Sequence, residues 1–292
     1  MENLPKTTKG VVLPADGTQP VAYGEAPLPE LTADKILVKI HSAPINPSDT
    51  YGIKGKYPDG KQRPSTAGLE GSGLVIAAGT SAEAQALLNK KVCFLTALDN
   101  GSWGEYTIIP HSRAYPLPEG LDYEAGAMCL VNPLTVQGFL LICEENNYTC
   151  IAQSASASQV GKMFLSGALK AGIKIINFVR RAEQAEALKA LGAEIVVNKG
   201  EEGWKEKAEQ ILKDNNVQAY FDPLAGADAG KIISLMPNNT TVYNYGRLTF
   251  KPLEIRPEEL IFKNKVIRGY WLSRTWAMRR EARRSSPGHS RI

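Results

Sequence analysis

The second half of the chain alternates short apolar runs with helical patterns, and this alternation limits the possible folds more than any other feature. The apolar runs, each of about five residues, occupy 148–152, 174–179, 194–198, 217–221, 240–245 and 266–272. Helical patterns occupy 135–144, 160–171, 182–191, 204–213 and a segment near 228–236. Such regular alternation is typical of a parallel sheet with helices on both faces. We therefore predict an α/β fold with a doubly wound parallel sheet, whose ligands bind at the carboxyl ends of the strands.

The first 120 residues have a different pattern. Short strands are indicated at 10–13, 35–41, 73–78 and 91–96, separated by Pro, Gly, Asn and Asp. A chain of 292 residues is near the size at which one core gives way to two. The predicted organisation is a β-rich domain, a nucleotide-binding domain, a last strand region that returns toward the first domain, and an atypical basic tail. Their bounds are 1–125, 126–265, 266–276 and 277–292.

The positive charge of the chain is concentrated at its C-terminal end. The formal net charge is +4, and Arg279, Arg280, Arg283, Arg284 and Arg291 lie in the predicted tail, which we expect to be disordered. The remainder is near neutral, so composition predicts neither nucleic acid nor a membrane surface as a partner. Nucleic-acid binding through the tail is an alternative that rests on composition alone. A salt-sensitive loss of DNA binding on deletion of residues 277–292 would support it.

Cysteine and histidine usage bears on location and on metal binding. The four cysteines have no CxxC spacing, which indicates reduced thiols. Neither a membrane-spanning apolar run nor a targeting segment is evident. A cytoplasmic location is therefore expected. His41, His111 and His289 have no cysteine or carboxylate at ligand spacing, which predicts that no metal is bound. Without a metal, a carbonyl or enone must be activated by hydrogen bonding or by a proton donor.

The turn after the strand at 148–152 is the first candidate for cofactor binding. In dinucleotide folds, backbone N–H groups and the helix dipole hold the pyrophosphate at this turn. The turn here is poor in glycine. Its small residues still permit a close approach of the backbone to a ligand, and its serine hydroxyls can add hydrogen-bond donors. Gly161 can let the helix and the strand pack closely. An ordinary capped turn is the alternative. The cofactor-binding candidates in this turn are Ser156, Ser158, Gln159, Val160 and Gly161.

The strand at 174–179 is followed by Arg180 and Arg181. Folds that prefer NAD place an acidic residue here to bind the ribose 2′-hydroxyl, whereas a guanidinium pairs with a 2′-phosphate. Solvated arginines are the alternative, although a cation is disfavoured near a helix N-terminus. The arginine pair therefore favours NADPH as the cofactor.

Two later strands end at the same predicted edge of the sheet. Tyr245 and Gly246 follow one of them, and residues 222–226 follow the other. From the residues alone, either segment could contact the nicotinamide ribose or form a turn.

Several motifs together resemble the medium-chain dehydrogenase/reductases. They are Ile45-Asn46-Pro47-Ser48-Asp49, Gly55-Lys56-Tyr57-Pro58, Gly68-Leu69-Glu70-Gly71-Ser72-Gly73, Gly101-Ser102-Trp103-Gly104-Glu105-Tyr106, Asn132-Pro133-Leu134-Thr135 and Ile267-Arg268-Gly269-Tyr270-Trp271-Leu272. The resemblance covers residues 10–276 in family order. It implies a Rossmann-type NADPH-binding domain and a GroES-like catalytic domain.

Leu69 stands where zinc-dependent members of this superfamily have a histidine ligand, and the structural-zinc cysteines are absent. The sequence therefore resembles the zinc-free branch, which includes quinone reductases and mitochondrial-type 2-enoyl thioester reductases. The resemblance implies hydride transfer from NADPH to a small-molecule quinone or enoyl thioester. It gives Tyr57 the role of proton donor or orienter, and it places Asn46 at the substrate and Thr135, Tyr245 and Gly246 at the nicotinamide. Relatives commonly dimerise through an edge strand of the nucleotide-binding domain. Residues 266–272 could form such a homodimer interface here, or could equally be only the last strand of the sheet.

The resemblance stops near Trp276, where relatives continue with a segment that completes the catalytic domain. The expected consequence is exposed apolar surface and a weakened cleft. A catalytically silent nucleotide-binding relative is therefore the alternative function, supported by Gln159 in the phosphate turn and by the altered C-terminus.

Overall fold

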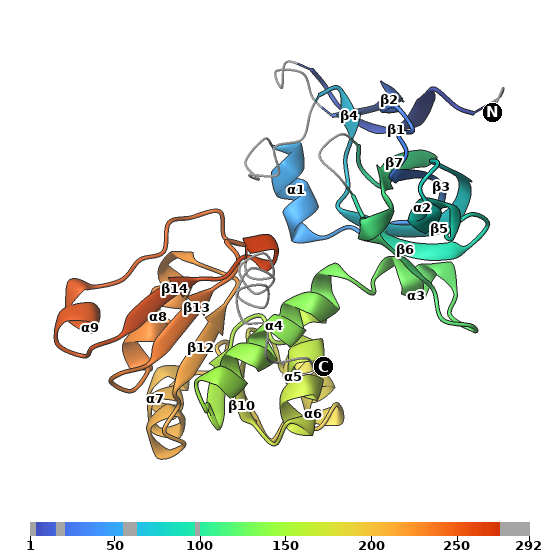
Figure 1. The fold of residues 1–292 in the computed structure, drawn as a ribbon. Helices are drawn as coiled ribbons and strands as arrows, with labels where there is room; N and C mark the ends of the chain where they lie inside the picture. The colour runs from blue at the N-terminus through green and yellow to red at the C-terminus, as the bar shows by residue number, and fades with distance from the viewer. Residues whose placement is uncertain (1–3, 16–20, 55–62, 97–99, 275–292) are drawn as a thin grey trace. The chain divides into compact units, whose positions relative to one another are not determined.

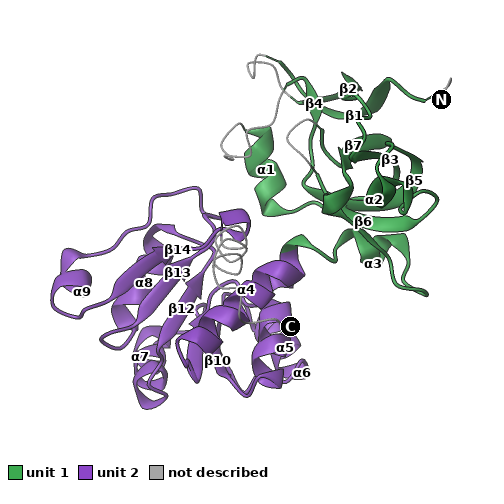
Figure 2. Cartoon of the chain, in the orientation of Figure 1, with its two compact units in different colours: residues 1–131 green, residues 132–292 purple. Residues whose placement is uncertain are grey.

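A computed structural model describes residues 4–15, 21–54, 63–96 and 100–274. The chain divides into two compact units, Met1–Val131 and Asn132–Ile292 (Figure 2). The predicted Tyr57 and the basic tail at 277–292 lie outside the described residues.

The second unit is built on a parallel sheet. Among the described residues the strand order is β11-β10-β9-β12-β13-β14, so the first strand lies in the middle (Figure 1). This is the order 3-2-1-4-5-6 of dinucleotide-binding sheets, and the predicted fold class is confirmed. The strands are β9 (Cys150–Gln153), β10 (Lys174–Val179), β11 (Ile195–Asn198), β12 (Ala219–Asp222), β13 (Thr241–Asn244) and β14 (Val266–Gly269).

Helices cover both faces of this sheet (Figure 1). Consecutive strand residues point to opposite faces, so each buried strand contributes to two cores. Ile151 and Phe221 pack with α4 (Val131–Glu145), α5 (Gln159–Lys170) and α6 (Ala182–Ala190). Their neighbours Ala152 and Tyr220 pack with α7 (Trp204–Asp214) and α8 (Gly226–Leu235). Two-sided burial explains why these strands are apolar throughout rather than alternating.

The end of the second unit contains one helix that the sequence analysis did not predict. β14 lies within the predicted apolar run at 266–272 and pairs with β13 in parallel register, at the edge of the described sheet. A short helix that the sequence analysis missed, α9 (Pro257–Ile261), precedes it. Glu259 anchors α9, because its buried carboxylate accepts a hydrogen bond from Lys265 Nζ at 2.7 Å.

The first unit is mainly antiparallel. Its described residues form one sheet with order β2-β1-β4 and another with order β7-β3-β5-β6-β8. The strands are β1 (Thr7–Leu13), β2 (Ala22–Pro27), β3 (Lys35–Ser42), β4 (Ser65–Thr66), β5 (Glu70–Ala78), β6 (Lys91–Leu95), β7 (Tyr106–Pro110) and β8 (Ala114–Pro116). Ile36, Val75 and Phe94 lie at the centre of its apolar core.

Three α-helices of the first unit interrupt the β-rich pattern. They are α1 (Pro47–Ile53), α2 (Ala82–Gln85) and α3 (Tyr123–Ala127). α1 matters for the site because its N-cap is Asn46, with proline at the first helical position and Asp49 in the first turn. This pattern is a recognised start signal for a helix. Among the described residues, no helix combines the length and the apolar character needed to span a membrane.

Candidate functional site

The turn that joins β9 to α5 lies at the carboxyl edge of the parallel sheet. Its Ser156 is buried, and the hydroxyl donates to the carbonyl oxygens of Gln153 (3.0 Å) and Phe178 (3.3 Å). The Ser156 N–H also donates to Phe178 O. Both donors of this predicted phosphate-binding serine are therefore used to fasten the turn to the ends of β9 and β10.

Gly161 and Ala155 define the shape of this turn. A Cβ atom at Gly161 would collide with the carbonyl group of Ser156, so glycine is what lets the first turn of α5 pack on the preceding loop. Ala155 has φ 50°, in the left-handed region that glycine usually occupies. The backbone thus adopts the tight turn of a dinucleotide fold although the sequence contains little glycine.

The first turn of α5 has donors that its own helix does not use. Ser158 is the N-cap, and its Oγ accepts from Gly161 N at 3.1 Å. The N–H groups of Gln159 and Val160 occupy the first two helical positions, where no intrahelical acceptor exists. These two groups, together with the positive end of the helix dipole, suit an anionic ligand.

Basic side chains lie beyond the neighbouring strands at the same edge. Arg180 and Arg181 follow β10 and are both exposed, and neither forms an ion pair with another described residue. Lys199, which follows β11, is 8% exposed and pairs with Asp228 at 3.2 Å. The sequence analysis missed Lys199, whose partner lies 29 residues away in α8.

The turn after β12 is organised by a buried carboxylate. Asp222 accepts from Leu224 N (3.0 Å), Ala225 N (2.9 Å) and Asn244 Nδ2 (2.9 Å). Burial raises the pKa of Asp222, and these hydrogen bonds act in the opposite direction. Tyr220 joins the network through hydrogen bonds to Asp222 and to Ser154. Asp222 is therefore a structural centre that fixes the ends of β9, β12 and β13 relative to one another.

An aromatic cluster links the predicted nicotinamide-end residues. Phe139 of α4 is fully buried, and its ring lies 4.8 Å from the rings of both Tyr245 and Tyr270. Thr135 lies one helical turn before Phe139, and its carbonyl oxygen accepts from Tyr270 Oη at 3.4 Å. Gly246 follows Tyr245 and approaches Pro223. Thr135 and Tyr245 are thus connected through Phe139 and Tyr270, and Gly246 is the residue after Tyr245 in the chain.

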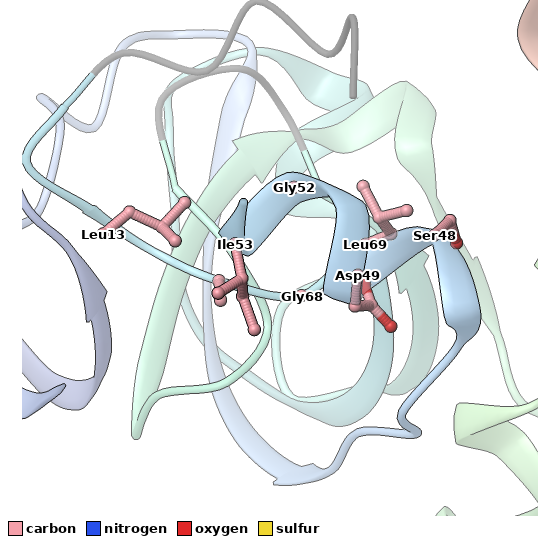
Figure 3. Close-up of a pocket in the computed structure, with 8 residues that line it drawn as sticks. Leu13, Ser48, Asp49, Gly52, Ile53, Gly68 and Leu69 are labelled. Atoms are coloured by element: carbon pink, nitrogen blue, oxygen red, sulfur yellow. The ribbon is translucent and has the colours of Figure 1, made fainter. Parts of the chain in front are cut away.

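In the first unit, the predicted substrate residue Asn46 is buried and held by carboxylates. Its N–H donates to Asp49 Oδ2 at 2.6 Å, and its Nδ2 donates to Glu70 Oε1 at 2.8 Å. The preceding loop is fixed by Trp103, whose Nε1 donates to Pro44 O. A small hollow lies between α1 and residues 67–69, with Ile53 and Leu69 in its lining (Figure 3).

The described residues offer no ligand set for a zinc ion. They contain no group of three or more His, Cys, Asp or Glu side chains suited to a metal. Burial raises the pKa of Cys93 to about 11 and that of Cys143 to about 12, so both are neutral thiols at neutral pH when no metal is bound.

Two family models match the chain. One, described as the alcohol dehydrogenase GroES-like domain, matches residues 32–119. The other, described as zinc-binding dehydrogenase, matches residues 160–285. Among the residues that the structure describes, no group of three or more His, Cys, Asp or Glu side chains corresponds to the metal in the second description.

Individual relatives point to the same group of proteins. A structure assigned to an NADPH:quinone reductase of Mesorhizobium loti is 30% identical with a TM-score of 0.86, and the match covers 97% of this chain and 86% of that one. The mitochondrial enoyl-[acyl-carrier-protein] reductase of Caenorhabditis elegans is 29% identical over 248 residues, which are 83% of this chain and 70% of the relative. A mitochondrial 2-enoyl thioester reductase heterodimer from Candida tropicalis shares the fold at 23% identity, with a TM-score of 0.76 and coverage of 96% and 86%.

Proposed function

This chain belongs to the medium-chain dehydrogenase/reductase superfamily, and from that premise we propose that it is a zinc-independent, NADPH-dependent oxidoreductase acting on an enone-type substrate. The substrate is a quinone or a 2-enoyl thioester. The observation that carries the proposal is the carboxyl edge of the parallel sheet, where a tight turn and a helix N-terminus lie near two arginines. Neither arginine has an acidic partner among the described residues. Similarity to quinone and enoyl reductases favours this function over a catalytically silent relative.

The chain's residues fit NADPH. The N–H groups of Gln159 and Val160, with the Ser158 hydroxyl, bind the pyrophosphate, and Gly161 allows the close approach. Arg180 and Arg181 bind the 2′-phosphate. Thr135, Tyr245 and Gly246 face the nicotinamide end. Ser156 acts indirectly, because its hydroxyl fastens the turn instead of reaching a ligand.

The reaction requires one hydride and one proton. NADPH, when bound, supplies a hydride to the β-carbon of the enone. Negative charge then develops on the carbonyl oxygen, where hydrogen bonding from the protein stabilises it. Tyr57 supplies or orients the proton that completes the reduction, since a neutral phenol is a competent donor at neutral pH. Asn46 orients the substrate.

The expected cytoplasmic location stays a prediction. Curated relatives of this chain carry names that place them in mitochondria.

Titration with NADPH and NADH tests the cofactor site first. We expect the wild-type chain to bind NADPH more tightly, and the Arg180→Ala/Arg181→Ala variant to lose that preference. Charge-assisted hydrogen bonds to a phosphate contribute about 1.5–3 kcal/mol, so the Kd for NADPH should rise about 10- to 100-fold. The Kd for NADH should remain unchanged, because NADH has no 2′-phosphate. Cofactor fluorescence measures both constants.

A matched control is Arg113→Ala in the first unit, whose guanidinium donates to Thr96 O. This variant should keep the NADPH preference. Equal affinity of the wild-type chain for both nucleotides would refute the assignment of the arginine pair.

We further propose a homodimer formed through β14. This strand is an edge of the sheet among the described residues, and its outer groups are available for pairing with another strand. Exposed apolar side chains lie beside it, with Ile261 at 68% and Phe262 at 78% exposure. A second copy of the chain would cover both the strand edge and this apolar surface.

Light scattering after gel filtration tests the dimer. The wild-type chain should elute at twice its mass of 31.7 kDa, and Phe262→Glu should elute as a monomer because a charge cannot be buried in an apolar interface. Tyr23→Glu, at a residue 75% exposed in the first unit, is the control and should remain dimeric. A monomeric wild-type chain at micromolar concentration would overturn the proposal.

A further inference from the structure

Among the described residues of the first unit, Glu70 is the most completely buried carboxylate, yet the proposed reaction gives it no role. Its side chain is 1% exposed and lies at the start of β5. An isolated carboxylate in such a place is costly, so its retention requires specific partners. Its two carboxylate oxygens have different partners from distant parts of the chain.

The first partner is the side chain of Asn46. Asn46 Nδ2 donates to Glu70 Oε1 at 2.8 Å, across 24 residues of sequence. An ionised carboxylate only accepts hydrogen bonds, so it fixes which end of the Asn46 amide faces it. The amide therefore has one orientation, with its nitrogen toward Glu70.

The second partner is the beginning of helix α4. Val131 N–H, at the first residue of α4, donates to Glu70 Oε2 at 2.8 Å. The carboxylate thus occupies the N-terminus of a helix of 15 residues, where the helix dipole favours negative charge. This stabilisation opposes the effect of burial, which raises the pKa of Glu70.

The backbone on both sides of the Glu70–Asn46 pair is also fixed. Thr96 Oγ1 donates to the carbonyl oxygens of Gly68 and Leu69, immediately before Glu70. Asp49 accepts from Asn46 N, and Trp103 fixes Pro44. Asn46 is thereby held both at its main-chain N–H and at its side-chain amide. A precisely oriented site residue requires such support.

We propose that Glu70 is a positioning residue for the reaction, which acts by holding the Asn46 amide in its substrate-facing orientation. The proposal rests on the proposed function, in which Asn46 contacts the enone-type substrate. Gln at this position keeps the size of the side chain, but its amide nitrogen cannot accept a hydrogen bond, so it cannot keep both partners. With its nitrogen toward Asn46, the Asn46 amide is released or reversed; with its nitrogen toward Val131, the N-terminus of α4 loses its acceptor and the carboxylate that fixed the Asn46 amide is no longer charged.

Steady-state kinetics of Glu70→Gln, with crotonyl-CoA and a benzoquinone as substrates, is the first test. We expect kcat to fall about 10- to 100-fold, the scale expected when a site group is misplaced by about 1 Å. The Kd for NADPH should be unchanged, because the proposed NADPH-binding residues lie in the second unit. Glu119→Gln, at an exposed residue, should behave as the wild type. Glu70→Asp keeps the charge on a shorter arm and should recover part of the lost kcat.

A double-mutant cycle with Asn46→Ala separates positioning from general destabilisation. If Glu70 acts through Asn46, Glu70→Gln should cause no further loss of kcat in the Asn46→Ala background. A multiplicative loss in that background, or a wild-type kcat in Glu70→Gln, would overturn the proposal.

The side-chain amide resonance of Asn46 provides a readout that does not depend on activity. This resonance, identified by its absence in Asn46→Ala, should shift in Glu70→Gln and stay in place in Glu119→Gln. An unshifted resonance would overturn the positioning role. A wild-type chain that binds NADPH but reduces neither substrate would count against the proposed function, while the resonance would still decide whether Glu70 orients Asn46.

Discussion

Tyr57→Phe is expected to lower kcat about 100- to 10,000-fold, the usual contribution of a positioned proton donor. The substitution removes one hydroxyl and leaves the ring, so binding of NADPH should not change. Tyr57 lies outside the described residues, so its role rests on the family resemblance and on this measurement. Initial rates of NADPH oxidation with each substrate measure the effect.

Tyr23→Phe serves as the control for this prediction, because Tyr23 is 75% exposed in the same unit. Its kcat should equal that of the wild type. Retention of full activity by Tyr57→Phe would show that the proton comes from another donor, such as the cofactor ribose or water. The role implied by the family resemblance would then be wrong for this chain.

Phe139→Ala is expected to destabilise the second unit by about 3–5 kcal/mol, the range for loss of a buried aromatic ring from a core. Phe139 is fully buried and contacts the rings of Phe164, Phe221, Tyr245 and Tyr270. Removal of the ring leaves a cavity among four aromatic side chains that are fixed by helices and strands. Urea denaturation followed by circular dichroism measures the change in the free energy of unfolding.

Phe250→Ala is the matched control, because Phe250 is 43% exposed. Its free energy of unfolding should change by less than about 1 kcal/mol, as expected for a surface substitution. Because Tyr245 loses a packing partner in Phe139→Ala, NADPH affinity should also fall in that variant. A loss of stability below about 1 kcal/mol would mean that the aromatic cluster can collapse around the missing ring.

The sequence predicts the parallel sheet well because each of its strands is a local signal. β10 lies at the predicted residues 174–179, and β9, β11, β12 and β13 lie within the predicted apolar runs or differ from them by one residue at an end. Two-sided burial makes such strands apolar at every position, so they are visible without knowledge of their neighbours. Right-handed crossovers limit the possible strand orders, and the structure supplies the order itself.

Short helices were harder to predict. α1 has seven residues and α9 has five, too few for a helical apolar pattern to repeat. Their start signals were nonetheless present, since proline stands at the first helical position of each. Reading Asn46 as an N-cap before Pro47 would have identified α1.

The candidate site is predictable only in part, because some of the residues that hold its side chains in place are far away in the sequence. The Gly161 turn and the arginine pair have local sequence signals, and their roles in binding the cofactor stay predictions. Glu70 and Asp222 were not assigned roles, because their partners are Asn46 and Val131 in one case and Asn244 in the other. A carboxylate that organises two distant turns looks, in the sequence, like any other acidic residue.

The turn between β9 and α5 is held by the Ser156 hydroxyl, which donates to the carbonyl oxygens of Gln153 and Phe178, and the turn has little glycine. Its backbone therefore has few alternative conformations to lose when a ligand arrives. Calorimetry of NADPH binding should accordingly show a small conformational entropy penalty from this segment. We expect a nucleotide whose pyrophosphate does not fit this backbone conformation to bind weakly, because the turn cannot rearrange around it.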